Sequence, residues 1–416
     1  MIPILSCRGS RRWLCTTAIL VLFPLASQAG DRYLTLDEVE SLALTSDQRL
    51  NSARLEIEAA NAMIDAAAQL EDPQARIAMQ SLPVDSFKFD QEAMTQLLVG
   101  VKQRFPAGDT RQLRKRRATA LAQQSSAELE EDQVKVLREV RLAWLDTYTA
   151  IRDAVLLEQK KNLLQQNMPL LESAYRAGRI RQLAISRMRV QIAKTEAAVV
   201  ATRSNEMAQR RVLAQWVPAV DSRKWPESLP DKLQQQPENT FPNNTQLKML
   251  KSRQRVLQQD IALAREKFKS NWAAEASYGV RETRSDLVTF GVTVSLPVAR
   301  KYRQTPELQR RQKLLAAVEA ETDYRHKDIV ATLSSLQQEV TALSRQISIY
   351  RSDIIPELEQ VKLLVDSDYS AGKALATDVI DADTELVKSR RTLLSLQVQR
   401  ARIIIEIHFL QGEKSS

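Results

Sequence analysis

Two short motifs occur twice in this sequence, in the same order and with nearly the same spacing. Residues 99–106 match 290–297, and residues 174–178 match 368–372, in each case about 190 residues further along. A single match arises readily by chance, whereas two collinear matches indicate a duplicated unit. The sequence therefore predicts two internal structural repeats, at 30–217 and 244–416, joined by a proline-rich connector at 218–243.

Each repeat contains a very long helical segment. The 416 residues include only 9 glycines and 14 prolines, which is a low content of turn-forming residues. The stretches from Gly108 to Gly178 and from Pro306 to Gly372 would each reach about 100 Å as helices, with kinks at Pro169 and Pro356. Heptad spacing predicts coiled-coil contacts for Leu137, Val140, Trp144, Ile151 and Val155, and for Ile329, Leu333, Leu336, Val340, Leu343, Ile347, Tyr350 and Ile354.

Shorter helices surround the long ones. The sequence from Thr35 to Glu38 is a capping box that opens a helix running to about Glu71. Tight turns near 175–178 and 369–372 are followed by returning helices at 180–217 and 374–411. We expect 180–217 to stack end to end with the helix at 244–270, and 374–411 to stack with the helix at 35–71, so that each pair matches one long helix.

Four runs alternate in hydrophobicity with period two, which is typical of β-strands. They form two predicted hairpins, at 74–105 and 273–296, in which apolar residues such as Val99, Tyr278 and Phe290 share one face. Runs of about nine residues suit a transmembrane β-strand with apolar residues toward lipid. The same pattern fits an ordinary hairpin packed on a soluble core, and the strands taken alone favour that alternative. A single four-stranded sheet would leave two open edges, and rods of this length need partners, so several copies closing into a tube would satisfy both.

The first 29 residues have the features of a secretory signal peptide. Arg8, Arg11 and Arg12 precede an apolar run at 13–26, and a small-x-small pattern ends at Ala29, where we expect cleavage. Both cysteines of the chain, Cys7 and Cys15, lie inside this segment. The mature chain is therefore expected to contain no disulfide and no thiolate metal site.

Over essentially the whole mature chain, the sequence resembles the TolC family of outer-membrane efflux ducts. The resemblance implies a mainly α fold with a small β part. Three protomers build an α-barrel through the periplasm, and each gives four strands to a shared twelve-stranded β-barrel in the outer membrane. It also implies a homotrimer in contact with outer-membrane lipid, served by a periplasmic adaptor (membrane fusion protein) and an inner-membrane RND-type pump.

The two helical tips carry the most specific part of this resemblance. The family's Tyr-x-x-Gly turn, followed by Asp-Val-hydrophobic-Asp-Ala, matches 369–382, so the resemblance places Asp378 and Asp381 at the closed periplasmic entrance. The ordinary alternative is two solvated acids on a helix surface. The first tip departs from the pattern, since it has Ala184 and Arg187 where the family often has acidic or amide residues. By the same resemblance, the turns would dock the adaptor through Tyr175, Ala177, Gly178, Tyr369, Ala371 and Gly372.

Residues 94–110 look most like the heavy-metal branch of the family, the CzcC-like and CusC-like ducts. This predicts heavy-metal cations as substrates, with organic compounds or a type I secretion substrate as the alternatives. His326 and His408 lie far apart in the sequence, so we predict no resident metal site and no cofactor. A passive duct needs neither.

Basic clusters follow both hairpins, at 111–117 and 300–311. They suit contact with the phosphates of the inner leaflet, and they suit a solvated helix face equally well. Nucleic acid is a poorer partner for an exported chain without interleaved aromatic residues.

The sequence has no GxGxxG, P-loop, HExxH or strand-borne GxSxG motif, so we do not expect an enzyme. The competing non-transport class is a periplasmic coiled-coil adaptor, which has one helical hairpin rather than two and more glycine.

Overall fold

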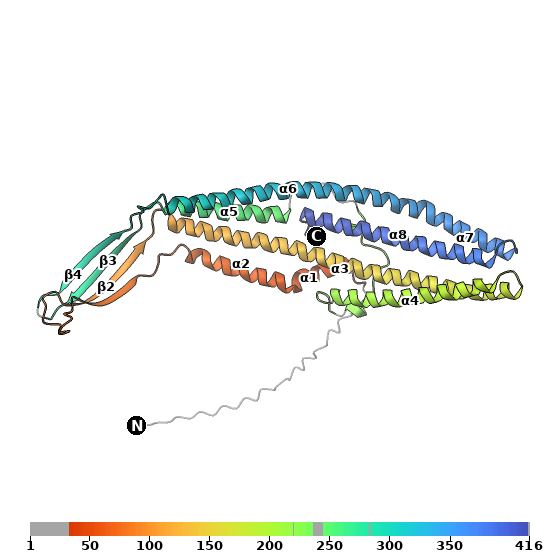
Figure 1. Ribbon diagram of the computed structural model, residues 1–416, viewed down its shortest axis with the longest axis horizontal. Coiled ribbons are helices and arrows are strands. Elements are labelled where there is room, and N and C mark those ends of the chain that lie inside the picture. Colours follow the sequence, from red (N-terminus) through yellow and green to blue (C-terminus); the bar gives the residue numbers. More distant parts are fainter. Residues whose placement is uncertain (1–32, 219, 236–243, 283, 415–416) are drawn as a thin grey trace, which may run out of the picture.

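A computed structural model describes residues 33–218, 220–235, 244–282 and 284–414. The predicted signal peptide and part of the predicted connector lie outside these ranges. Figure 1 shows an elongated molecule with a β-sheet at one end and two helical turns at the other. None of the described helices combines the length and the hydropathy of a membrane-crossing helix.

The elements follow the same order in both halves of the chain. The first half contains α1 (Leu36–Ser46), α2 (Gln48–Ala66), β1 (Gln74–Gln80), β2 (Gln96–Phe105), α3 (Thr110–Arg176) and α4 (Gln182–Leu213). Two short 3₁₀ turns, Val220–Ser222 and Asp231–Leu233, lie between the halves. The second half contains α5 (Thr245–Glu266), β3 (Trp272–Val280), β4 (Leu287–Val294), α6 (Gln304–Ile349), a π-helical turn (Tyr350–Ile354), α7 (Ile355–Ser370) and α8 (Ala376–Gln411).

The four strands form one antiparallel sheet in the order β1-β2-β3-β4. The two halves meet at the centre of the sheet, where Val99 of β2 lies opposite Tyr278 of β3. On the outer pairs, Ile77 is opposite Val99 and Tyr278 is opposite Val288. The apolar positions of all four strands therefore fall on the same face, as their alternation predicts.

The helices lie in layers around α3. On one side α3 contacts α1, α2 and α4, and on the other it contacts α5 and α8, which in turn pack against α6 (Figure 1). The predicted end-to-end pairs are wrong: α8 meets α5, where the Asn244 side-chain amide donates to the Leu410 carbonyl at 2.6 Å, and α4 ends beside α1. The sheet order explains this. Because β2 pairs with β3, the helices α3 and α5 lie side by side where they join the sheet, and α8 continues the position of α5 along α3.

The heptad seams form the main core near the middle of the helices. Val140, Trp144, Ile329 and Val340 belong to one buried cluster, and the Trp144 indole N–H donates to the Leu34 carbonyl at 3.2 Å. Val155 departs from the predicted seam, since 39% of it is exposed, and Tyr350 and Ile354 in the π-helical turn are not buried. The other predicted seam residues are buried or half-buried. The long helices are therefore stabilised by packing along the seam rather than by helix propensity.

One helix break was not predicted, and the two predicted proline positions differ from each other. The helix expected at 35–71 is divided at Asp47, whose extended backbone ends α1 and caps α2. Pro169 lies inside α3, which continues from Thr110 to Arg176 and is buried on both sides of the proline at Leu164 and Leu171. Pro356 lies directly after the π-helical turn, so the long helix of the second half loses its regular α-helical bonding at the predicted position.

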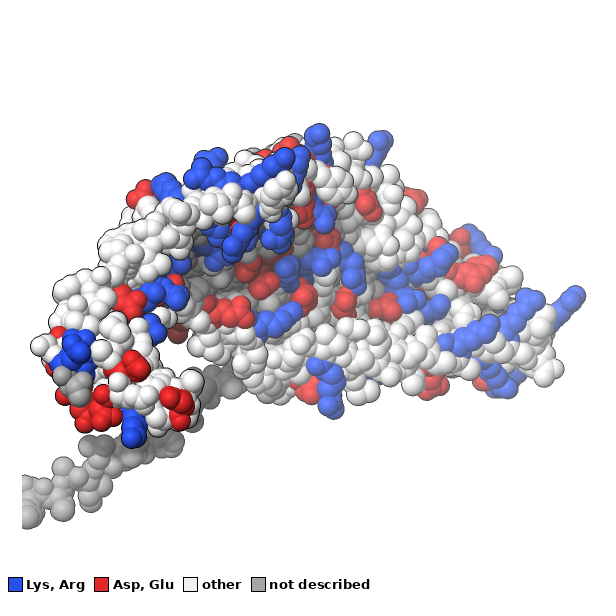
Figure 2. All heavy atoms as spheres, turned by 60° about the vertical axis from the view of Figure 1, so that its left-hand side comes forward, with Lys and Arg blue, Asp and Glu red and all other residues white. Residues whose placement is uncertain are grey.

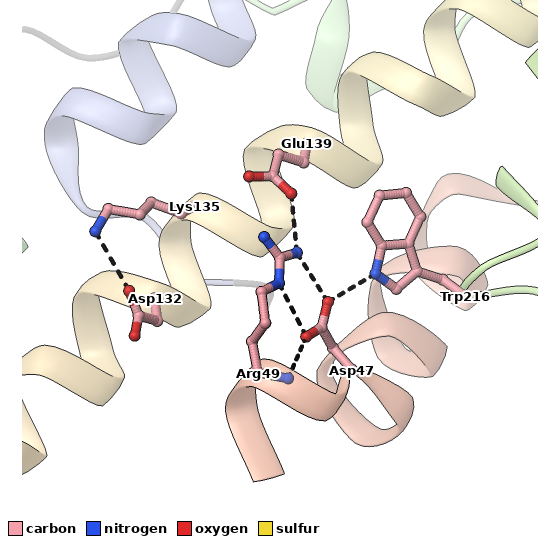
Figure 3. A network of polar contacts seen from close by, with 6 residues as sticks. All are labelled: Asp47, Arg49, Asp132, Lys135, Glu139 and Trp216. Carbon is pink, nitrogen blue, oxygen red and sulfur yellow. Dashed lines mark hydrogen bonds and ion pairs between the residues drawn. The ribbon is translucent and has the colours of Figure 1, made fainter. Parts of the chain in front are cut away.

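Asp47 ties three elements together where α4 approaches α1 (Figure 3). Its carboxylate accepts from the backbone N–H of Arg49 at 2.9 Å, from the Arg49 guanidinium at 2.9 and 3.2 Å, and from the Trp216 indole at 2.9 Å. Arg49 also reaches Glu139 of α3 at 2.9 Å. The acid that splits the predicted helix therefore fixes the joint between stacked helices.

Burial by itself raises the pKa of Asp47, but hydrogen bonds from Arg49 and Trp216 and the charge of Arg49 lower it to about 2. The ionised side chain therefore stabilises the fold above its ordinary pKa of 3.8, and that stabilisation is lost as the pH falls toward 2. We expect Asp47→Ala to lower the free energy of unfolding by about 2 kcal/mol at neutral pH. Urea denaturation should show this difference shrinking as the pH is lowered from 4 toward 2.

Asp132→Ala is the matched control for this prediction. Asp132 makes only an exposed i,i+3 ion pair with Lys135 at 3.3 Å in the same view (Figure 3), so its loss should cost less than about 0.5 kcal/mol. A penalty for Asp47→Ala that does not change with pH would contradict the assigned role of the carboxylate.

Candidate functional site

The sheet exposes its apolar face. Ile77 is 75% exposed, Phe290 81% and Val292 71%, and the same face carries Met79, Leu97, Val99, Val101, Trp272, Tyr278, Val280, Val288 and Val294, all of them exposed. Phe105 and Trp272 stack at the helical end of this face, with ring centroids 4.1 Å apart. A contiguous exposed apolar face of this kind marks a surface that meets lipid or another chain.

The opposite face of the sheet is polar and partly shielded. Glu275 lies 3.8 Å from both Arg76 and Lys102, and Arg104 lies 3.9 Å from Glu71. In β2, Gln96 and Gly100 on this face are buried, while their apolar neighbours are exposed. A hairpin packed on a soluble core buries its apolar face and exposes its polar face. This sheet does the reverse, so the soluble-hairpin alternative does not describe it.

Both helical turns at the far end have the same backbone geometry. Gly178 and Gly372 have φ of 68° and 75°, in the left-handed region. Each turn closes with two backbone bonds: the N–H groups of Gly178 and Arg179 donate to Tyr175 and Ala174, and the equivalent pair in the second turn follows the same pattern. This is the Schellman motif, in which glycine ends a helix without steric strain.

The helices directly behind the two turns pack against each other. A small apolar cluster contains Leu164, Leu171, Ile185 and Met188 from the first helical hairpin and Ala376 and Ile380 from the second. Tyr369 packs against this cluster, so it supports the tip, whereas Tyr175 is 44% exposed. Ala177, Gly178, Ala371 and Gly372 are also exposed. The two tips therefore form one surface, on which five of the six predicted docking residues are accessible.

Asp378 and Asp381 lie in the first turns of α8, and both are exposed. Their i,i+3 spacing places them on one side of the helix. Asp378 also accepts the backbone N–H of Leu375 at 2.8 Å, so it caps α8 as well as presenting a charge. The structure thus brings the two predicted gate residues together beside the second tip, and the first tip presents the exposed Arg181 and Arg187 instead.

Sequence reasoning did not identify Asp383, which is 5% exposed. Its carboxylate accepts from Lys362 of α7 and from the Asn167 side chain of α3, the latter at 2.9 Å. Asp383 therefore links both helical hairpins just above the tips. The available signal was its place on the apolar stripe of α8, between Val379 and Leu386, where an acid is expected to be paired.

Three arginine–carboxylate pairs join α3 to α8 along the middle of the molecule. Arg138 binds Glu406 at 2.8 and 2.9 Å, Arg391 binds Asp153 at 2.6 and 2.9 Å, and Arg402 binds Asp146. Because α3 and α8 come from different halves, these pairs fix the register between the two repeats.

Among the described residues, no group of three or more histidine, cysteine, aspartate and glutamate side chains is arranged to hold a metal ion. His408 is buried, and its Nε2 lies 3.4 Å from the Glu413 carboxylate. Burial lowers the pKa of His408, an effect that the nearby Glu413 opposes.

No protein-family model and no curated protein matches this sequence. The structure, however, is similar to several solved outer-membrane channels. The outer membrane protein VceC from Vibrio cholerae superimposes with a TM-score of 0.74 at 16% identity, over 92% of this chain and 97% of that one. CusC, whose structures concern transmembrane channel formation, gives 0.72 at 15% identity, over 94% and 95%.

The fold is that of the TolC-like channels. The outer-membrane channel OprN matches as well, with a TM-score of 0.71 at 14% identity, over 91% of this chain and 89% of that one. The TolC-like fold consists of long helices carrying a small antiparallel sheet, and this confirms the predicted fold class. These scores differ too little to favour one of the three neighbours over the others.

Proposed function

We propose that this protein is the outer-membrane exit duct of a tripartite efflux system. It conducts solutes passively from the periplasm to the exterior. The observation that carries the proposal is the exposed apolar face of a four-stranded sheet, set at the end of a TolC-like helical body. Such a face is stable in lipid and unfavourable in water.

The sheet edges support a closed assembly of several copies. β1 and β4 are the two edge strands, and open edges are not tolerated within lipid. Three copies would close a twelve-stranded barrel with the polar face, including Arg76, Lys102 and Glu275, toward the lumen. The same three copies would bury the remaining exposed apolar positions of the long helices, such as Leu363 and Leu364 of α7.

The tip end is the proposed periplasmic entrance. Asp378 and Asp381 of three copies would form a ring of six carboxylates, which repels anions and binds cations at a narrow axis. The tip surface would dock a periplasmic adaptor, which couples the duct to an inner-membrane RND-type pump. Cleavage of the signal peptide near Ala29 and residence in the outer membrane are parts of the same proposal.

Valine at Gly178 or Gly372 should weaken adaptor docking. An added Cβ meets no atom within 4 Å at either position, so the penalty comes from the left-handed backbone alone. A β-branched residue in that region costs about 1–2 kcal/mol and should distort the turn. We expect the yield of adaptor crosslinked at the tips to fall severalfold.

Asparagine at the same positions is the control, because it tolerates the left-handed region. Gly178→Asn and Gly372→Asn should keep most of the crosslinking. Full crosslinking in the valine variants would contradict docking through these turns.

Heavy-metal cations are the proposed substrates, supported by the resemblance at 94–110 and by the carboxylates of the entrance. Organic compounds and type I secretion substrates are the alternatives within the same fold. A deletion strain should be tested against a panel of metal ions and a panel of drugs and dyes. Sensitivity confined to metals would support metal export, and broad drug sensitivity would contradict it.

The duct itself is tested by electrical recording on the purified chain in planar lipid bilayers. We expect discrete conductance steps and recovery of the protein in the outer-membrane fraction of cells. A trimeric preparation that inserts into the bilayer without conducting would contradict the proposal.

A further inference from the structure

The loop between β4 and α6, residues 295–303, presents large apolar side chains to solvent. Val298 is 88% exposed, Tyr302 81% and Leu296 71%. Leu296 continues the exposed apolar face of β4, two residues beyond Val294. Backbone bonds hold the loop in shape: the N–H of Val298 donates to Leu296 at 2.9 Å, and those of Tyr302 and Arg303 donate to Ala299. The apolar side chains are therefore held outward by an ordered loop.

Three cations alternate with these apolar residues. Arg300, Lys301 and Arg303 are exposed, and among the described residues no carboxylate lies within ion-pair distance of any of them. Arg300 donates to the Phe268 carbonyl at 3.3 Å, and the Lys301 ammonium lies 5.7 Å from the centre of the Tyr302 ring. Figure 2 shows the wider accumulation of Lys and Arg where the helices meet the mostly uncharged sheet.

Three other cations of this region are paired, whereas Arg116 and Arg310 have no ion pair among the described residues. Lys115 binds Asp65 at 2.8 Å, and Arg117 and Arg311 both bind Asp260, at 2.5 and 2.8 Å. In the first repeat, the matching loop after β2 is held by side chains as well: the N–H of Ala107 donates to Asn271 at 2.7 Å, and that of Asp109 donates to Glu266 at 3.0 Å. Of the two strand-to-helix loops, the one after β4 thus combines exposed apolar side chains with positive charges that form no ion pair.

We propose that residues 295–303 bind the phosphates of anionic phospholipids in the leaflet that faces the periplasm. This inference rests on the proposed function, because it takes the apolar sheet face to be in lipid. Leu296, Val298 and Tyr302 then enter the interfacial region, and Arg300, Lys301 and Arg303 lie at the depth of the headgroups. Apolar side chains beside cations are the chemistry that recognises a negatively charged membrane surface.

Trp272 provides a native reporter for this site. It is 46% exposed on the apolar face, whereas Trp144, Trp216 and Trp225 are buried. It also adjoins the loop, since the Ser295 N–H donates to the Asn271 carbonyl at 2.8 Å. The full chain should be reconstituted with brominated phosphatidylcholine or brominated phosphatidylglycerol, because bromine quenches tryptophan fluorescence only on close contact.

We expect both lipids to quench, with phosphatidylglycerol preferred on the order of tenfold at low ionic strength. The triple variant Arg300→Gln, Lys301→Gln, Arg303→Gln should reduce this preference to nearly one. A control with Lys327→Gln, Arg345→Gln and Arg351→Gln removes three exposed cations from the long-helix side of the second repeat and should keep it.

Each other outcome is decisive. Equal quenching by the two lipids in the wild-type chain would overturn the lipid site and leave the duct intact. Quenching by neither lipid would show that the sheet does not face the membrane and would overturn the proposed function. A triple variant that keeps its lipid preference but loses crosslinked trimer would assign the loop to a subunit contact and overturn the inference.

Discussion

Replacing Asp378 and Asp381 together by asparagine should raise single-channel conductance severalfold and weaken block by multivalent cations on the order of tenfold. In the proposed trimer the double variant removes six negative charges from one narrow ring. Mutual repulsion and bound counterions both disappear with those charges. Conductance and block should be measured on the same channels in planar bilayers.

Asparagine is a better choice here than alanine. Asp378 accepts the backbone N–H of Leu375 at 2.8 Å, and an asparagine side-chain oxygen can keep that cap. The measured change then reports charge rather than fraying of α8. Glu172→Gln with Glu385→Gln is the matched control, since it removes two other exposed carboxylates from the helical hairpins. If the control variant and the gate variant behave alike, the ring is not the constriction.

Arginine at Phe290 should largely prevent membrane insertion. Phe290 is 81% exposed near the middle of the edge strand β4, on the apolar face and opposite Ala276. A charged side chain on the lipid face near the bilayer midplane costs about 2–4 kcal/mol per copy. In a trimer that penalty acts three times. We expect the variant to be lost from the outer-membrane fraction and to insert poorly into vesicles.

Thr289→Arg tests the same strand on its other face. Thr289 lies opposite Ser277, among the polar side chains, so an arginine there should insert almost as well as the wild-type chain. Equal loss of insertion for both variants would mean that β4 is merely intolerant of arginine. If both variants insert as well as the wild-type chain, the apolar face of the sheet does not contact lipid.

Local periodicity predicted much of this molecule. Alternation at 97–105 and 288–296 located two strands and their apolar faces, because side chains in a strand point to opposite sides whatever surrounds them. The heptads around Val340 and Trp144 likewise located the core, because each long helix buries one stripe. The glycines at 178 and 372 indicated the two turns, because glycine permits the left-handed backbone that both turns adopt.

Long-range arrangement was less accessible. Which short helix stacks on which depends on the β2–β3 pairing, and no local pattern encodes that choice. The break at Asp47 depends on Arg49, Trp216 and Glu139, which come together only in the folded chain. Asp383 was overlooked for the same reason, since its partners Lys362 and Asn167 lie on other helices. The roles of Asp378 and Asp381 remain predictions from the resemblance.

The pairing of β2 with β3 has a consequence for the history of such a molecule. It makes the seam between the two halves equivalent in kind to the seam that β4 and β1 would form between neighbouring copies. A ring of three chains is then a ring of six near-equivalent modules, in which every second joint carries a covalent tether. An ancestor of half the length could have assembled as a hexamer of single modules, and gene duplication would then have freed the two module types to diverge, one with acidic and the other with basic residues at its tip.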